Sequence, residues 1–341
     1  MFKFLGALLT LAVALVLLIV TWPPLFGLQT TMWVAQVTAM RGLLTACCIA
    51  ALVLLLFIGI IRPLRGFAGG MAIVMFLAAL ANGGILLYRG FDQTSLPEPT
   101  DQSVTVLSWN TLGTAVNPET IAKLALDSNA DIVALPEAPR THGDAVAGAM
   151  KAAGKPMGVY TQTFNSGGAI SATTVLVSTR LGKYTQAASN GLGDQNTLVV
   201  PSVVLYPANG TGPTIIASHA VSPSKPQMHN WRDDLAWLAA QCDAENVIIA
   251  GDFNATLDSI AGMGIGPGAT LGRCLDAGLA TRSAALGTWP TKLPAFLGAP
   301  IDHVFATPVW NFTGMTVHSE FDEAGSDHRP ITVRMVPATA D

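Results

Sequence analysis

The segment from Val247 to Asn254, which reads VIIAGDFN, decides the expected fold. Four consecutive apolar residues, three of them β-branched, are typical of a buried strand. The strand runs into Gly251, and Asp252 and Asn254 then follow at alternate positions. A buried strand that ends in a carboxylate and an amide indicates an α/β domain with a polar site at its strand ends.

The same arrangement recurs through residues 104–338. Further strands are predicted from apolar runs at 104–109, 132–135, 173–177, 203–206, 214–218, 304–306, 315–318 and 331–335. Helical patterns alternate with them at 121–126, after the helix start Asn117-Pro118-Glu119, and at 230–242. We therefore expect one α/β domain, arranged as a two-sheet sandwich with helices outside.

Residues able to bind a metal ion stand at the ends of several predicted strands. They are Asn110, Glu137, His219, Asp252, Asn254, Asp302, Asp327 and His328. Strand ends on one edge of a sheet converge on one crevice. Carboxylate and amide oxygens suit Mg²⁺, Mn²⁺ or Ca²⁺, and the sequence has neither the cysteine cluster nor the His-x-x-x-His pair that would favour zinc. Such a site suits phosphoryl chemistry, in which a metal neutralises charge on the phosphate while an acid and a base move protons.

The first 89 residues form a different kind of segment. Their only charged side chains are Lys3, Arg41, Arg62, Arg65 and Arg89. Apolar stretches at 5–22, 42–61 and 66–88 are each long enough to span a bilayer. The first resembles a signal peptide, but it lacks an obvious cleavage site and two further stretches follow, so a retained plain anchor is expected. A polar connector at 90–103 then leads into the catalytic domain.

The positions of the basic residues predict the orientation of this anchor. Lys3 lies at one end of the first span, and Arg62 and Arg65 lie in the turn between the second and third. Basic residues of this kind favour the cytoplasmic side, which places the domain after Arg89 outside the cytoplasm. Arg41 and Arg89 fall on the outer side and weaken this bias.

Charge and cysteine content give information on nucleic-acid binding and on the redox compartment. Residues 90–341 hold 13 of the 18 bases and all 22 acids, a formal net charge of −9 that argues against a surface that coats nucleic acid. Cys47 and Cys48 lie in an expected span. Cys242 and Cys274 either pair in an oxidising compartment or remain two small buried thiols.

Six motifs stand in a fixed order in the catalytic domain: LSWN (107–110), LPE (135–137), SH (218–219), GDFN (251–254), IDHV (301–304) and SDHRP (326–330). Together they resemble the motif series of the endonuclease/exonuclease/phosphatase superfamily, across about residues 104–336. That superfamily includes DNase I-like nucleases, abasic-site endonucleases, sphingomyelinases and inositol-polyphosphate phosphatases. The resemblance implies a four-layer α/β sandwich and a divalent metal ion.

The resemblance also implies roles for the motif residues. Glu137 matches the principal metal ligand, and Asn110 and Asp327 match residues near the metal and the phosphate. One position departs from the pattern, because Pro136 stands where the family usually has glutamine. Proline lacks the side-chain contact of glutamine and has no backbone N–H donor. This departure affects the fine positioning of groups in the site, but not the ability of Glu137 to bind a metal.

The remaining motif residues match the family's acid, base and phosphate-binding groups. Asp252 and Asn254 match the pair that positions the attacking water and a phosphate oxygen. His328, oriented by Asp302, resembles the family's His–Asp dyad, and His219 matches the histidine that binds the phosphate or assists the leaving group. The resemblance identifies the set and leaves open which member is the base.

For two loops and two further residues inside the motifs, the sequence leaves alternative roles open. Residues 221–230 and the apolar segment 288–300 could shape access to the site, or simply cover the core; the second could also dip toward lipid. His303 and Arg329 lie inside motifs, and structural or rim roles are expected for both.

The function predicted from these features is hydrolysis of a phosphate ester or pyrophosphate on a lipid in the outer leaflet, by a multi-pass protein of a bacterial cell membrane. A looser resemblance, to a membrane protein group linked to teicoplanin resistance, implies a cell-wall lipid carrier. The alternatives are a membrane-tethered nuclease, a phospholipase C or sphingomyelinase-like phosphodiesterase, and a binding protein with a decayed site. The sequence makes no prediction of oligomeric state.

Overall fold

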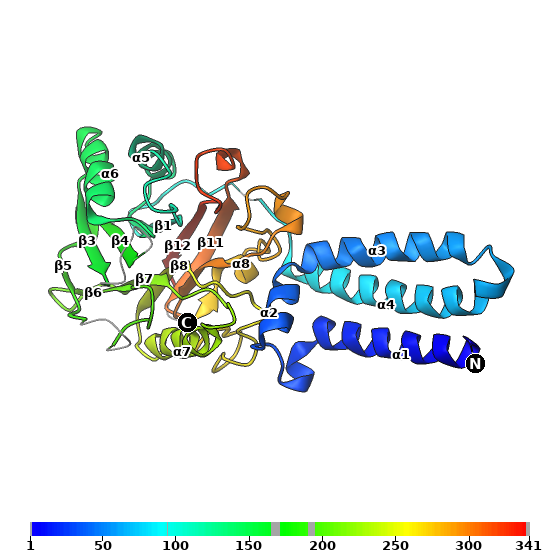
Figure 1. Ribbon diagram of the computed structural model, residues 1–341. Helices are drawn as coiled ribbons and strands as arrows, with labels where there is room; N and C mark the ends of the chain where they lie inside the picture. Colours follow the sequence, from blue (N-terminus) through cyan, green and yellow to red (C-terminus); the bar gives the residue numbers. More distant parts are fainter. Residues whose placement is uncertain (1, 94, 165–170, 190–194, 339–341) are drawn as a thin grey trace.

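The computed structural model describes residues 2–93, 95–164, 171–189 and 195–338. The N-terminal part contains four helices: α1 (Phe2–Thr21), α2 (Met32–Ala39), α3 (Arg41–Ile58) and α4 (Arg65–Arg89). Three helical segments, 3–21, 41–58 and 62–89, are long and apolar enough to cross a membrane, in agreement with the three predicted spans. Figure 1 shows α1, α3 and α4 side by side, with the catalytic domain at one end of them. These candidate spans mark the chain as a membrane protein.

The catalytic domain is built on two six-stranded mixed sheets. The first has the order β11-β12-β1-β2-β4-β3, with β1 (Val104–Ser108), β2 (Ile132–Pro136), β3 (Met157–Thr163), β4 (Ala172–Ser178), β11 (Trp310–Val317) and β12 (Ile331–Pro337). The second has the order β5-β6-β7-β8-β10-β9, with β5 (Tyr184–Gln186), β6 (Val203–Pro207), β7 (Thr214–His219), β8 (Val247–Asp252), β9 (Leu275–Asp276) and β10 (Asp302–Ala306).

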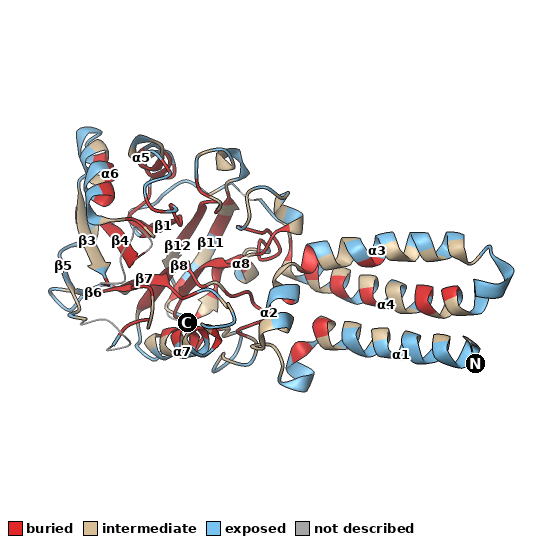
Figure 2. Ribbon diagram, in the orientation of Figure 1, coloured by how far each residue is buried: buried red, intermediate tan, exposed pale blue. Residues whose placement is uncertain are grey.

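The two sheets pack face to face and helices cover their outer faces. Val106, Ile132, Ile248 and Val304 belong to one buried cluster between the sheets. The helices of the domain are α5 (Pro118–Asp127), α6 (Arg140–Ala152), α7 (Met228–Gln241) and the short α8 (Ala277–Ala280). Residues of α5 and α6 share a second cluster with the first sheet, and residues of α7 share a third with the second sheet. Figure 2 shows the buried residues concentrated in these layers, while much of the surface of α1 and α3 is exposed. The predicted α/β sandwich is confirmed, with α5 and α6 on one outer face and α7 on the other.

The predicted helix starts and strand ends lie close to the observed ones. Asn117 caps α5, where its side chain accepts a hydrogen bond from the backbone N–H of Glu119, as a residue before proline at a helix start can. The helix expected at 230–242 is α7, which begins two residues earlier. By contrast α2, β3, β5 and α6 were not predicted from the sequence.

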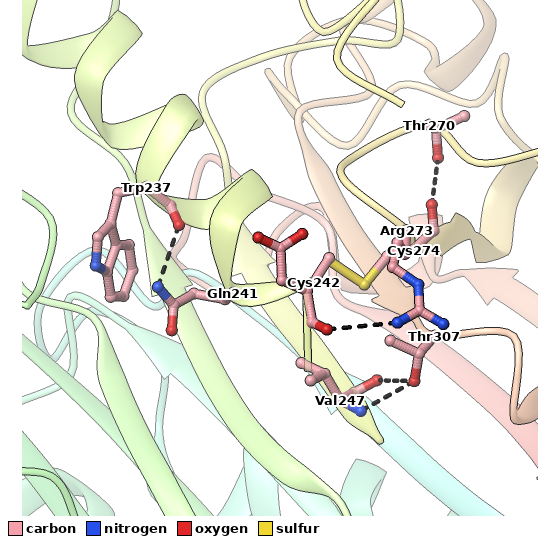
Figure 3. Close-up of a disulfide and its surroundings, with 9 residues drawn as sticks. Trp237, Gln241, Cys242, Val247, Thr270, Arg273, Cys274 and Thr307 are labelled. Atoms are coloured by element: carbon pink, nitrogen blue, oxygen red, sulfur yellow. Dashed lines mark hydrogen bonds between the residues drawn. A yellow bond between two sulfur atoms is a disulfide. The ribbon is translucent and has the colours of Figure 1, made fainter. Parts of the chain in front are cut away.

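A disulfide joins the end of α7 to the loop before β9 (Figure 3). Cys242 follows the last residue of α7, Cys274 precedes β9, and 32 residues separate the two cysteines in the chain. Of the two alternatives for these residues, the structure shows the pair. Both side chains are fully buried, in the cluster that covers the second sheet.

Removal of this disulfide is expected to destabilise the catalytic domain. Replacing both cysteines with alanine should lower the Tm of the detergent-purified protein by about 5–15 °C, because a closed loop of this length restricts the unfolded chain by an equivalent of about 2–4 kcal/mol. Thermal unfolding followed by near-ultraviolet circular dichroism measures the shift. An unchanged Tm, or two alkylatable thiols at these positions in unreduced protein, would contradict the expectation.

Candidate active site

Three neighbouring strands of the second sheet align three of the predicted site residues. In the parallel pair of β7 and β8, His219 lies opposite Asp252. In the antiparallel pair of β8 and β10, Asp252 lies opposite Asp302. Because directly opposed residues have Cβ atoms about 5 Å apart, the register alone places the three side chains in one row.

The first sheet supplies Asn110 and Glu137, which follow the parallel strands β1 and β2. The amide nitrogen Nδ2 of Asn110 lies 3.0 Å from Glu137 Oε1 and 3.0 Å from Asp252 Oδ2. His219 Nε2 lies 3.8 Å from Glu137 Oε1. Asn110 therefore connects the two sheets at the point where their strand ends meet.

Unusual backbone conformations direct two of these side chains. Glu137 and Asn254 have positive φ values of 62° and 47°, in the left-handed region that residues other than glycine rarely adopt. Gly251 also has a positive φ, of 151°, and a Cβ atom there would lie 2.0 Å from the carbonyl oxygen of Ser218 on β7. Strained residues of this kind cluster at functional sites, where the surrounding structure holds them in place.

The loop before β12 presents His328 to Asp302 and Asp252. His328 Nδ1 lies 2.9 Å from Asp302 Oδ2, and its Nε2 lies 3.7 Å from Asp252 Oδ2. The loop is fixed to the first sheet, because Trp109 Nε1 donates to the carbonyl of His328 and Ser326 Oγ donates to the carbonyl of Asn110. Asp302 can therefore orient the imidazole, as the sequence resemblance implied.

Asp327 occupies the edge of this group. Its Oδ2 accepts a hydrogen bond of 2.8 Å from the indole Nε1 of Trp289. Among the described residues it makes no hydrogen bond to Asn110 or Glu137, although its charge contributes to raising the pKa of Glu137. Sequence patterns did not predict the contact with Trp289, which belongs to the apolar segment 288–300.

Asn254 completes the set of eight predicted residues. Its backbone N–H donates to Asp252 Oδ1 at 2.7 Å, and its Nδ2 donates to the carbonyl of Ala220 at 2.9 Å. Asp252 thus accepts hydrogen bonds through both of its oxygens. All eight residues gather where the strand ends of the two sheets meet, with Asp327 outermost.

His303 and Arg329 lie inside motifs but have structural contacts. The buried His303 ring lies 2.8 Å from Asp276 Oδ2 and 3.0 Å from the carbonyl of Ala255. Arg329 is buried and donates to the carbonyls of Gly287 and Leu293. Arg329 therefore fixes the segment that carries Trp289, on the rim of the site.

Burial shifts the pKa values of Glu137 and His219, which face each other across the two sheets. Burial raises the pKa of Glu137, partly offset by its hydrogen bond from Asn110. Burial lowers the pKa of His219, whose imidazole is therefore neutral at pH 7. A neutral imidazole can accept a proton or donate one to a phosphate oxygen.

The pKa values of Asp252 and His328 are both raised, for different reasons. Burial raises the pKa of Asp252 to about 6. Burial alone would lower the pKa of His328, but the carboxylates of Asp302 and Asp252 outweigh it and raise the value to about 10. His328 is therefore an imidazolium at neutral pH, and its Nε2 proton faces Asp252.

Two parts of the site could hold a divalent metal ion. Asp252, Asp302 and His328 are buried, and each offers a ligand atom within 4.8 Å of the others. His328 Nδ1 and Asp302 are already hydrogen-bonded to each other, so a metal there would replace that contact. Glu137 Oε2 offers a second place, because it is buried and has no hydrogen-bond partner among the described residues. An orphaned buried carboxylate oxygen fits a hard cation such as Mg²⁺.

The arrangement can perform phosphoester hydrolysis. A bound divalent cation would supply charge neutralisation at the phosphate oxygens. Asp252 is placed to orient and deprotonate a water molecule, since its carboxylate is held by Asn110 and Asn254. His328 holds a proton at Nε2 that can stabilise charge on a phosphate oxygen, and Asp302 keeps the ring in position. His219 lies on the opposite side of Asp252, within reach of the same phosphate.

The pKa of Asp252 predicts an acid limb in the pH profile of activity. Below pH 6 the protonated carboxyl can no longer accept a proton, so kcat/KM is expected to fall about tenfold per pH unit. A bound cation favours the carboxylate and moves the limb to lower pH. The profile is therefore measured with a water-soluble phosphate ester at the lowest metal concentration that supports turnover. A flat profile down to pH 4 would contradict the assignment of Asp252.

Similarity to known proteins identifies the family and the fold of the chain. Residues 107–328 match the model of the endonuclease/exonuclease/phosphatase family. A search of curated proteins finds no match. Among solved structures, the fold is similar to an endonuclease/exonuclease/phosphatase from Beutenbergia cavernae, with 18% identity, 70% of this chain and 72% of that chain covered, and a TM-score of 0.51.

Two further structures show the same fold at low identity. One is a humanized TDP2 from D. rerio, with 18% identity, 69% of this chain and 99% of that chain covered, and a TM-score of 0.52. The other is a family protein from Leptotrichia buccalis, with 12% identity, 68% and 99% covered, and a TM-score of 0.52. The matched family model spans all eight predicted site residues. The chain belongs to the endonuclease/exonuclease/phosphatase family and is a phosphoesterase with a DNase I-like fold.

Proposed function

We propose that the protein is a divalent-metal-dependent phosphoesterase that hydrolyses a phosphate ester or pyrophosphate of a lipid-linked substrate in the outer leaflet of a bacterial cytoplasmic membrane. Mg²⁺ is the proposed metal, with Mn²⁺ or Ca²⁺ as substitutes, and the lipid bilayer is the proposed partner. Nucleic acid is not a proposed substrate, given the net charge of −9 on residues 90–341. The resemblance to the teicoplanin-resistance membrane group adds a cell-wall lipid carrier as one candidate, and this refinement rests on the sequence alone.

The observation that carries the proposal is a buried ionic junction between the membrane helices and the catalytic domain. Asp258 lies four residues after Asn254 and receives hydrogen bonds from Arg41 at the start of α3 and Arg89 at the end of α4. Arg41 Nη2 lies 2.6 Å from Asp258 Oδ1, and Arg89 Nη1 lies 2.8 Å from Asp258 Oδ2. Burial alone would raise the pKa of Asp258, but the two guanidinium groups lower it, so the carboxylate is charged at neutral pH.

Further contacts make this junction extensive. Arg41 also donates to Asn82 Oδ1 on α4, and the Asn82 amide donates to Thr21 Oγ1 on α1 at 2.9 Å. A Cβ atom at Gly42 would lie 2.0 Å from the carbonyl oxygen of Phe296, so the segment 288–300 packs directly on α3. The backbone N–H of Asp92 donates to the carbonyl of Arg282 at 2.8 Å, just after α4 ends. Tight packing of this kind keeps the active site close to the bilayer.

Two observations support an extracytoplasmic catalytic domain. Arg62 and Arg65 are exposed in the turn between α3 and α4, and Figure 1 shows that turn and the N-terminus at the end remote from the domain. Basic residues at that end favour its cytoplasmic placement. The disulfide between Cys242 and Cys274 is of a kind that forms in oxidising compartments. Arg41 and Arg89, which weakened the charge bias in the sequence, are both engaged by Asp258.

Product analysis with a substrate panel tests the proposal. Detergent-purified full-length protein is incubated with Mg²⁺ and polyprenyl phosphates, polyprenyl pyrophosphates, phospholipids or plasmid DNA, alongside an Asp252→Asn variant. Release of inorganic phosphate from a lipid, lost in the variant, supports the proposal. Release of a phosphorylated headgroup instead would establish a phospholipase C-like diesterase, and cleavage of DNA with inert lipids would establish a nuclease.

A further inference from the structure

One cavity of about 530 Å³ runs between the active site and α2. His328 and Asn254 line one end of it, and Ala35, Ala39 and Met40 line the other. α2 belongs to the N-terminal part of the chain, between the first and second candidate spans. The membrane part therefore supplies one wall of a cavity that opens onto catalytic residues.

The α2 wall is fixed to the catalytic domain. Ala35 is 2% exposed and belongs to the buried cluster that includes α7. Gln36 Nε2 donates to the carbonyl of Pro223 at 3.0 Å, and Arg232 Nε on α7 donates to the carbonyl of Thr30 at 2.9 Å. Figure 1 shows α2 between the catalytic domain and the long helices. The α2 wall of the cavity therefore packs directly on the catalytic domain.

The cavity lining is mixed. Polar residues such as Asn254, Ser259 and His328 share it with apolar residues such as Ala39, Met40 and Ile301. Among the described residues that line it, none is lysine or arginine. A nucleic-acid groove would present basic side chains along the path of the phosphates, so this cavity fits a ligand with one phosphate end and an apolar body.

The α2 end of the cavity lies next to the start of α3, because Met40 directly precedes Arg41. Trp22 after α1 is 63% exposed, and Trp33 on α2 is 71% exposed. Exposed tryptophans at the ends of membrane helices mark the boundary between hydrocarbon and water. A phosphate bound at His328 would therefore direct an attached chain past α2 and into the bilayer.

We propose that this cavity is the subsite for the apolar chain of a lipid phosphate, adjoining the scissile phosphate, with Ala39 and Met40 as residues that determine chain specificity. This proposal rests on the proposed function. It adds where the substrate binds and in which direction its apolar chain leaves the phosphate. The volume suits the first part of a chain and not a whole lipid, so the distal part remains in the bilayer.

Filling the α2 end of the cavity tests the subsite. Ala39→Trp enlarges a cavity-lining residue, and Val37→Trp makes a similar change on the same helix at a 40% exposed position outside the cavity. For full-length protein in mixed micelles, the measured quantity is the ratio of kcat/KM for a long-chain polyprenyl phosphate to that for p-nitrophenyl phosphate. Ala39→Trp is expected to lower this ratio about tenfold or more, and Val37→Trp to leave it unchanged. Ala39→Leu, a smaller change, provides the readout if the tryptophan variant does not fold.

The possible results separate this proposal from the proposed function. If both tryptophan variants keep the wild-type ratio while the wild type hydrolyses polyprenyl phosphate, the subsite is wrong and the function stands. If the wild type hydrolyses no lipid phosphate, the proposed function fails and the subsite fails with it. A lowered ratio for Ala39→Trp alone supports both.

Discussion

Replacing Asp252 with asparagine is expected to lower kcat for phosphoester hydrolysis by about 10³-fold or more, because it removes the carboxylate at the centre of the site. Asp252 accepts hydrogen bonds from the amide groups of Asn110 and Asn254 and faces the Nε2 proton of His328. An asparagine of the same shape cannot deprotonate water, and one of its side-chain atoms would present hydrogens toward donors. The measurement is the initial rate of phosphate release at saturating Mg²⁺.

The matched control for this variant is Asp233→Asn on α7. Asp233 is a half-exposed carboxylate that contacts His229 at 3.3 Å and lies outside the group of site residues. The control should retain the wild-type rate, because exposed pairs of this kind contribute little to stability. If Asp252→Asn keeps more than a tenth of the wild-type kcat while folding normally, the assignment of the catalytic carboxylate is wrong.

The second large effect is expected at the junction. Asp258→Asn would leave Arg41 and Arg89 without their shared carboxylate, in a place where Arg41 is only 2% exposed. Removing one partner from a buried ion pair costs about 3–5 kcal/mol, which corresponds to a loss in Tm of about 10 °C or more. The catalytic domain should also become easier to separate from the helices, and limited proteolysis near residues 90–103 measures that change.

Two comparisons make the junction prediction specific. Asp92→Asn disrupts the half-exposed pair with Arg282, at 3.6 Å, and should change the Tm by less than about 3 °C. The triple variant Arg41→Met, Arg89→Met and Asp258→Leu removes all three charges together and should recover most of the lost stability, because apolar groups of similar volume can replace a buried ionic cluster. Equal losses from Asp258→Asn and Asp92→Asn would show that the buried pair does not hold the two parts together.

The strand-end residues of the site could be predicted from the sequence for a definite physical reason. His219 and Asp252 end apolar runs and Asp302 begins one, and the pairing of β7, β8 and β10 places these three residues next to one another. The register of the strand pairs therefore brings residues together that are far apart in the sequence. Backbone geometry could not be predicted in the same way, because nothing in the strand pattern indicates that Glu137 adopts a positive φ of 62°.

The contacts between the membrane helices and the catalytic domain could not be predicted from the sequence. Arg41 and Asp258 are 217 residues apart, and Asp258 stands alone in a loop after the Asp252 motif. Asn82 lies within an apolar helix, where its role becomes apparent only through its contacts with Arg41 and Thr21. Single polar residues of this kind find their partners only in the tertiary structure. The pattern of apolar residues along the chain does not indicate which residues will pair.

Two elements of the first sheet layer were missed because their patterns are weak. The buried residues of α6 include small ones such as Gly143, with Val146 and Met150 as its large apolar contacts. β3 is an edge strand whose residues are mostly half-buried, so it lacks the apolar run that marked β2 and β8. Neither element contains one of the eight predicted site residues, so their absence from the prediction did not affect that set.

The central claim is that a metal-dependent phosphoesterase site works on lipid at the membrane surface. The most direct test reconstitutes full-length protein and a Glu137→Gln variant in liposomes that contain a polyprenyl phosphate, removes metal with EDTA, and titrates Mg²⁺ while phosphate release is measured. The account predicts no release in EDTA, saturable release with Mg²⁺, and a requirement for about 10–100-fold more Mg²⁺ in the variant. Undiminished hydrolysis in EDTA, or no release of phosphate from the lipid at any Mg²⁺ concentration, would contradict it.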